Sequence, residues 1–235
     1  MLIIIGILLG AFISIRLVKA RKEKSLKNKE ERELKKFRLE TLGEDIEIES
    51  QEHAERIANR LLPEAVKTAI DLDAILCADI NALLDEENNS EIGRRRLIRE
   101  IVSYVEAICN SYQKIGAIAY AIYGEDQLKP HYSQKQLKAI RGKKLSTSER
   151  IKTLTAVGHK VFFNGESNSN FNGEGWDKAL KLISKRHELT HPSKSEHLRI
   201  DENEWQDLLE GARYLMSESY EPNRLMTEKL VSEKE

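Results

Sequence analysis

Residues 94–123 carry the pattern that most constrains the fold of this chain. Apolar side chains recur there three or four positions apart over about eight helical turns, which is the periodicity of one buried helix face. They are Ile98, Ile101, Val102, Val105, Ile108, Cys109, Tyr112, Ile115 and Ala119. The spacing predicts a single long core helix, and Gly124 follows where a helix C-cap is expected.

Other segments with helical periodicity lie on both sides of this helix. The stretch from Gln51 to Leu84 precedes it, and we expect Pro63 to break or restart the helix there. No segment alternates like a strand, and no internal repeat is visible. The sequence therefore predicts an all-α fold, an antiparallel bundle of about five helices over residues 51–220, followed by a polar tail at 221–235.

Two local motifs predict where later helices begin. Ser146 followed by Glu149 forms a capping box, and Asp201 followed by Glu204 has the same spacing. The basic, polar stretch 130–144 is expected to be a loop with a short helix.

The N-terminus differs from the rest of the chain. Met1 to Ile15 carries no charged side chain, and Arg16 can reach the interface from a bilayer. Basic residues flank only its C-terminal side, which predicts that the remainder of the chain is cytoplasmic. We interpret residues 1–18 as a single-pass membrane anchor and 19–50 as a charged linker. A buried core helix and a removed signal peptide are the weaker interpretations.

Composition limits the function in two ways. The net charge of −1 argues against a protein held to nucleic acid mainly by a basic surface, although an enzyme that contacts one phosphate remains compatible with it. The cysteines, Cys77 and Cys109, both fall in apolar helical patterns. We expect buried thiols rather than a disulfide, as in a reducing compartment.

The segment "RHELTHPSKSEH", from Arg186 to His197, supports two incompatible interpretations. In the first, His187 and His191 have the H-E-x-x-H spacing of zinc peptidases, Glu188 is the general base and His197 is a third ligand. However, Pro192 follows the second histidine and disfavours the helical conformation there. This spacing is therefore a poor fit to a zinc site.

In the second interpretation the arginine and a histidine carry metal-free chemistry. A stripe of apolar side chains, if continued by three and four residues, places Arg186 and His187 on the buried side of a helix that ends near Thr190. The stripe consists of Trp176, Ala179, Leu180 and Ile183. A fixed guanidinium can hold a phosphodiester, and a histidine such as His191 can move protons on and off it.

The segment "KRHELTHP" resembles the R-polar-x-x-x-H motif of the HEPN superfamily (higher eukaryotes and prokaryotes nucleotide-binding domain). The helices "LIREIVSYVEAICNSYQKI" and "ENEWQDLLEGARYL" also resemble helices of bacterial HEPN-like proteins. The likeness covers about Glu52 to Tyr220. The resemblance implies a helical bundle that forms a homodimer, with the two motifs facing each other, and in many members a metal-independent endoribonuclease.

Transferred to this chain, the resemblance implies a role for each motif residue. Arg186 would bind the scissile phosphate, and His191 would act as general base or acid for attack by the ribose 2′-hydroxyl. His187 would orient the phosphate, although asparagine or aspartate is commoner at that position. Glu106, beside the inward stripe of the long helix, either pairs with Arg186, orients His191, or points to solvent.

The resemblance implies an RNA substrate and a role in stress or phage defence, with no cofactor and no metal. The alternative is a non-catalytic dimerisation or regulatory module at the membrane, and a zinc peptidase comes third. Two basic stretches, 94–96 and 135–144, either track an RNA backbone or are a solvated helix start and loop.

Overall fold

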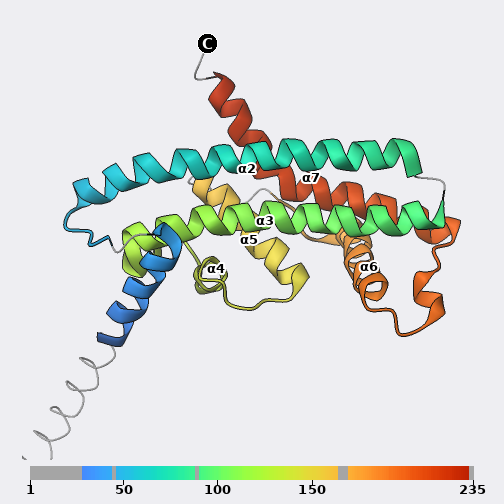
Figure 1. Cartoon of the computed structure of the whole chain (residues 1–235), viewed down its shortest axis with the longest axis horizontal. Helices are drawn as coiled ribbons and strands as arrows, with labels where there is room; N and C mark the ends of the chain where they lie inside the picture. The colour runs from blue at the N-terminus through green and yellow to red at the C-terminus, as the bar shows by residue number, and fades with distance from the viewer. Residues whose placement is uncertain (1–27, 44–45, 88–89, 164–168, 233–235) are drawn as a thin grey trace, which may run out of the picture. The chain divides into compact units, whose positions relative to one another are not determined.

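The computed structural model describes residues 28–43, 46–87, 90–163 and 169–232 of the 235-residue chain. All regular structure in these residues is helical and none of it is strand, as predicted (Figure 1). The chain divides into two compact units with a boundary between Glu49 and Ser50. In the first unit residues 28–42 form a helix.

The predicted membrane anchor at 1–18 lies outside the described residues. Within the described ranges, no helix combines the length and the apolar character that crossing a bilayer requires.

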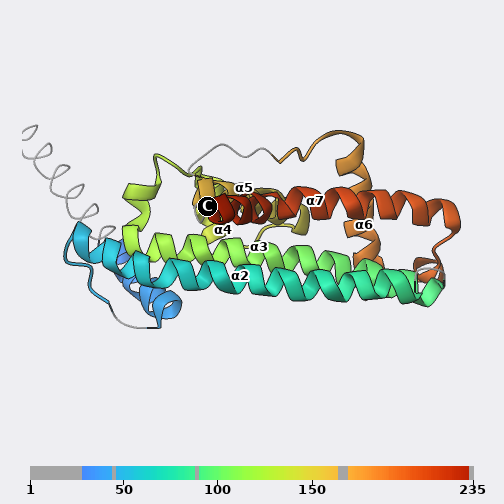
Figure 2. The same ribbon diagram turned by 90° about the horizontal axis from the view of Figure 1, so that it is seen from above.

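The second unit is a layer of long helices crossed by shorter ones. Its elements in chain order are α2 (Gln51–Glu87), α3 (Glu91–Leu128), α4 (Gln134–Ile140), α5 (Thr147–Phe163), α6 (Gly173–Thr190), the 3₁₀ helix η1 (Ser195–Leu198) and α7 (Glu202–Ser232). Figures 1 and 2 show α2 and α3 side by side as a long hairpin, with α7 running along α3 and α6 crossing both α3 and α7.

The core is centred on α3, which contacts α2, α4, α5, α6 and α7. Most of the predicted stripe is fully buried, including Ile98, Val102, Val105, Ile108 and Tyr112. Ala119 is only partly buried, and Leu97 and Ala121, which the stripe did not include, are buried as well. Gly124 has φ 76° and a non-helical conformation, so the first run of α3 ends at the predicted position, although the helix resumes after this kink and ends at Leu128. Arg99, Ser103 and Asn110 are exposed, so one side of the helix stays polar while the other sides are buried, which gives the segment its apolar periodicity.

The expected helix starts and the short α4 are also present. Glu149 N–H donates to Ser146 Oγ at 3.4 Å, and Glu204 N–H donates to Asp201 Oδ1 at 2.9 Å. Cys77 and Cys109 are both free thiols, and Cys109 is buried as expected, whereas Cys77 is half-buried.

The prediction of an antiparallel bundle is wrong for one central pair, α3 and α7. Arg94 near the start of α3 bonds Glu202 at the start of α7 at 2.5 Å, and Tyr112 farther along α3 donates to the Ser219 carbonyl at 2.8 Å. The two helices therefore run in the same direction. The reason is that residues 129–201, including α4, α5 and α6, carry the chain back to the start of α3 before α7 begins.

Pro63 does not break α2, contrary to the prediction. Its ring lies on the exposed side of the helix. The Asn59 carbonyl, which loses its usual N–H partner four residues on, can therefore be hydrated, and the helix continues past the proline.

α7 continues past residue 220, where a polar tail was expected, and runs through Pro222 to Ser232. Pro222 has no N–H to donate to the Glu218 carbonyl. Ser169 Oγ donates to that carbonyl instead, at 2.9 Å. Ser219 and Asn223 are buried here, so this polar turn packs against the core rather than leaving it.

Candidate active site

α6 presents the predicted motif at its C-terminal end. The helix ends at Thr190, and His191 is its C-cap with φ −129° and ψ 65°, as expected from the proline that follows. The predicted buried stripe is partly wrong, because Leu180 is 37% exposed. The buried side chains are Trp176, Ala179, Leu182, Lys185 and Leu189. Leu182, rather than Ile183, belongs to the buried face. Three residues after Leu182 that face reaches Lys185, which is therefore the buried cation.

Lys185 forms a buried ionic link between α6 and α7, which the sequence interpretation missed. Its side chain is 8% exposed, and its Nζ lies 2.9 Å from Glu204 Oε1 and donates to the Arg199 carbonyl at 2.8 Å. Glu188 Oε2 lies 4.0 Å from the same Nζ. The ammonium is therefore satisfied by the fold and is not available to a substrate.

Arg186 contacts α3 through the predicted carboxylate. Its Nη2 lies 3.3 Å from Glu106 Oε2, and the two side chains are 29% and 27% exposed. Pairing with Arg186 was one of the three expected roles of Glu106. The carboxylate restrains the guanidinium, while the exposed part of the arginine can still reach a ligand.

His187 and His191 form a second pair, with ring centroids 5.2 Å apart. Both residues are exposed, so the expectation that His187 continues the buried stripe is wrong. The reason is that the buried face of α6 is centred on Lys185 and Leu189, which turns His187 outward. Within the described residues, no hydrogen bond, ion pair or ring contact joins this pair to Arg186 and Glu106.

The residues of the zinc interpretation do not converge. Glu188, the general base of that interpretation, is half-exposed and lies near Lys185. His197 lies in η1, where its Nδ1 accepts from Ser193 N–H at 3.4 Å. In the described part of the chain, no three histidine, cysteine or acidic side chains form a group that could hold a metal ion.

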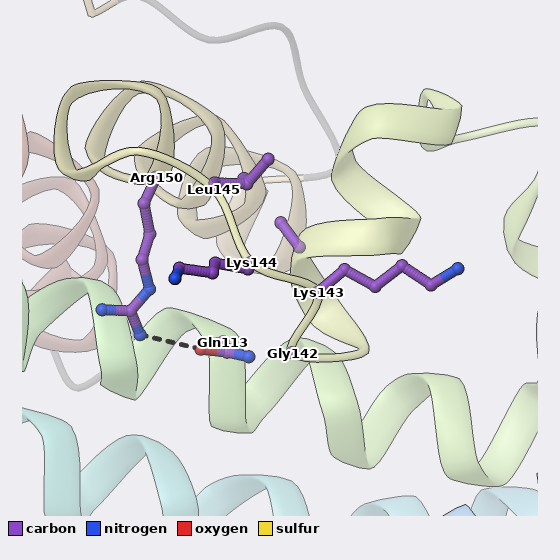
Figure 3. Close-up of a pocket in the computed structure, with 7 residues that line it drawn as sticks. Gln113, Gly142, Lys143, Lys144, Leu145 and Arg150 are labelled. Carbon is purple, nitrogen blue, oxygen red and sulfur yellow. Dashed lines mark hydrogen bonds between the residues drawn. The ribbon is translucent and has the colours of Figure 1, made fainter.

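Two surface cavities are found among the described residues, and the first of them includes Glu188 of the motif. One of about 390 Å³ is lined by Lys181, Ser184, Lys185, Glu188, Glu204, Asp207 and Leu208. The other, of about 260 Å³, is lined by Gln113, Ala139, Gly142, Lys143, Lys144, Leu145 and Arg150 (Figure 3). Its arginine had no sequence signal, because nothing in the pattern distinguishes Arg150 from other charged residues in the first turn of a helix.

No protein family model, curated protein sequence or solved structure matches this chain. The likeness to HEPN proteins therefore rests on the residues of the motif and the helices around it. The site has to be interpreted from its own chemistry.

Proposed function

We propose that this chain is a metal-independent endoribonuclease with a HEPN-like helical domain. The observation that carries the proposal is a half-buried guanidinium held by a carboxylate, on the same helix end as two exposed imidazoles. Arg186 supplies a fixed positive charge, and His187 and His191 supply imidazoles, the commonest general acids and bases of enzymes.

In this mechanism the ribose 2′-hydroxyl attacks the adjacent phosphorus, and the bond from phosphorus to the 5′ oxygen breaks. His191 takes the proton from the 2′-hydroxyl or gives one to the leaving oxygen. Arg186 binds the non-bridging oxygens and stabilises the charge that grows on them in the transition state. The products are a 2′,3′-cyclic phosphate and a 5′-hydroxyl.

Glu106 and His187 have supporting roles in the proposal. Glu106 fixes the direction of the guanidinium, because an ion pair at 3.3 Å limits its rotamers. His187 orients the phosphate from the neighbouring helical position. The Arg186–Glu106 pair and the His187–His191 pair do not contact each other within one chain. A second copy facing the first would therefore complete the site, as the predicted homodimer implies.

One observation favours the alternative, a non-catalytic dimerisation or regulatory module. Arg186 already has a carboxylate partner, and this ion pair ties α6 to α3 across 80 positions of sequence. A purely structural arginine would make the same contact. The two functions differ in whether loss of the guanidinium changes chemistry or only stability.

Substitutions in the motif test the proposal. Arg186→Ala and His191→Ala should each lower the rate of RNA cleavage by at least about a hundredfold, the usual effect of removing one transition-state contact. Glu188→Gln should leave the rate nearly unchanged, and EDTA should have no effect. The measurement is cleavage of labelled single-stranded RNA by the full chain, with circular dichroism to verify folding.

Other outcomes point elsewhere. Inactive Glu188→Gln together with normal Arg186→Ala would favour a metal site with Glu188 as general base over the arginine and histidine mechanism. Equal RNA cleavage by all variants would show that the motif does not carry the activity, and no cleavage by the wild type would favour the non-catalytic module. Glu106→Gln is the control for loss of the ion pair, because it removes the carboxylate charge and keeps the Arg186 guanidinium.

A further inference from the structure

The charged side chains that line the cavity beside α5 are all basic. Its lining includes three basic side chains, from Lys143, Lys144 and Arg150, and no acidic one. The cavity between α6 and α7 is different, since its lysines face Glu188, Glu204 and Asp207. Of these two cavities, the one beside α5 therefore lacks an acidic counter-charge in its lining.

Two of these cations converge. Figure 3 shows the Lys144 side chain extending toward the Arg150 guanidinium, whereas Lys143 extends in the opposite direction. Among the described residues, no carboxylate forms an ion pair with either Lys144 or Arg150. Two like charges that point toward each other repel, and an anion bound between them would relieve the repulsion.

Neutral amides hold the arginine in place. Arg150 Nη2 donates to Gln113 Oε1 at 2.9 Å and to Asn110 Oδ1, both on α3. A guanidinium has five N–H groups, and these bonds occupy only the Nη2 pair. Because the partners carry no charge, they orient the arginine without neutralising it, and the remaining N–H groups keep the fork geometry that suits phosphate.

We propose that this pocket is a phosphate-binding site, with Lys144 and Arg150 as its two cationic ligands. Its volume of about 260 Å³ lies below the usual range for whole drug-sized ligands, which begins near about 300 Å³. The pocket therefore suits a single phosphate group, from an RNA backbone or from a small phosphorylated compound.

The helix α3 relates this pocket to the candidate active site. Glu106 contacts Arg186, whereas Asn110 and Gln113 contact Arg150. These two amides lie four and seven positions after Glu106, so all three residues share one helix face. At 1.5 Å per residue they span about 10 Å along the helix. If RNA is the substrate, the pocket holds a phosphate that flanks the scissile one, and this assignment rests on the proposed function.

The test compares the full-length wild type with Lys144→Gln and with the matched control Lys143→Gln, which removes the same charge next to it. One probe is inorganic phosphate, read as the rise in Tm at constant ionic strength. The other is a short single-stranded oligonucleotide with 2′-O-methyl riboses, read by fluorescence anisotropy. Because this oligonucleotide cannot be cleaved by 2′-hydroxyl attack, the result does not depend on the proposed activity.

The rise in Tm with phosphate should be lost in Lys144→Gln and kept in Lys143→Gln. For an RNA phosphate, Lys144→Gln should weaken oligonucleotide binding about tenfold, or about 1.4 kcal/mol, and Lys143→Gln at most about twofold. Loss of the phosphate response alone would assign the pocket to a small phosphorylated compound. Equal responses of the wild type and Lys144→Gln to both probes would overturn the phosphate site.

Discussion

His159 shows how burial and one hydrogen bond determine the state of a single side chain. The residue is 1% exposed, and its Nε2 lies 2.9 Å from Ser169 Oγ. Ser169 donates its one hydroxyl hydrogen to the Glu218 carbonyl, so Nε2 of His159 must carry a hydrogen and donate. Desolvation lowers the pKa of His159 below its ordinary 6.5, against a smaller opposing effect of Glu221.

The lowered pKa of His159 makes stability depend on pH in a defined direction. Above 6.5 the imidazole is neutral in both states, whereas below 6.5 the unfolded chain binds a proton that the folded chain resists. The free energy of unfolding should therefore decline as pH falls below about 6.5, and less steeply in His159→Gln. Urea unfolding at neutral and mildly acidic pH measures how steeply the free energy of unfolding depends on pH in the wild type and in His159→Gln.

The control for this prediction is His187→Gln, because His187 is exposed. That variant should keep the wild-type slope. Identical slopes in the wild type and His159→Gln would show that burial of His159 does not contribute to acid sensitivity.

At the scale of the element, the crossing of α6 and α7 depends on close backbone approach. A Cβ placed on Gly211 would lie 2.4 Å from the Lys178 carbonyl oxygen. Charges flank the crossing, since Lys178 pairs with Glu174 at 3.2 Å, with Asp207 at 3.4 Å and with Glu210. These exposed carboxylates add little stability individually, so the packing of the backbones is the main constraint.

Gly211→Ala should separate α6 from α7. Overpacking against backbone typically destabilises by about 1–3 kcal/mol, and the better helix propensity of alanine offsets at most about 1 kcal/mol of that. We expect a net loss in the free energy of unfolding, measured by urea denaturation. Ser217→Ala, at an exposed position of the same helix, should change it by less than about 0.5 kcal/mol. A Gly211→Ala variant as stable as the wild type would mean that the helices can move apart freely.

At the scale of the whole molecule, the helical domain from Ser50 onward is a compact unit by itself. Residues 1–49 contain the apolar run and, from Arg16 to Lys29, seven basic residues against one acidic residue. This asymmetry is the basis for the proposed single-pass anchor with a cytoplasmic domain.

Deleting Met1 to Val18 should release the protein from membranes without unfolding it, because the compact helical unit begins more than thirty positions later. The measurement is fractionation of cell lysates, followed by circular dichroism of the truncated chain. Sedimentation of the truncated chain with membranes after a high-salt wash would contradict the anchor.

The sequence by itself determined the features that depend on local interactions. The core helix α3 could be predicted because it is buried along its length, so its apolar positions follow the helical period without interruption. The caps at Ser146 and Asp201 and the end of α6 before Pro192 could be predicted because they depend on residues within one turn. The helix end that carries the motif residues could therefore be predicted from sequence alone.

Only the tertiary structure decided which groups meet across the fold. The buried face of α6 differs from the predicted one because it includes Lys185, whose charge is compensated by Glu204 of α7. Hydrophobic periodicity does not identify a lysine as a buried residue. The shared direction of α3 and α7 depends on the path of the chain between them, and α7 passes Pro222 because Ser169, from a distant loop, bonds the freed carbonyl. Arg150 meets its amide partners for the same reason: residues far apart in sequence become neighbours only when helices pack, and no local pattern encodes that contact.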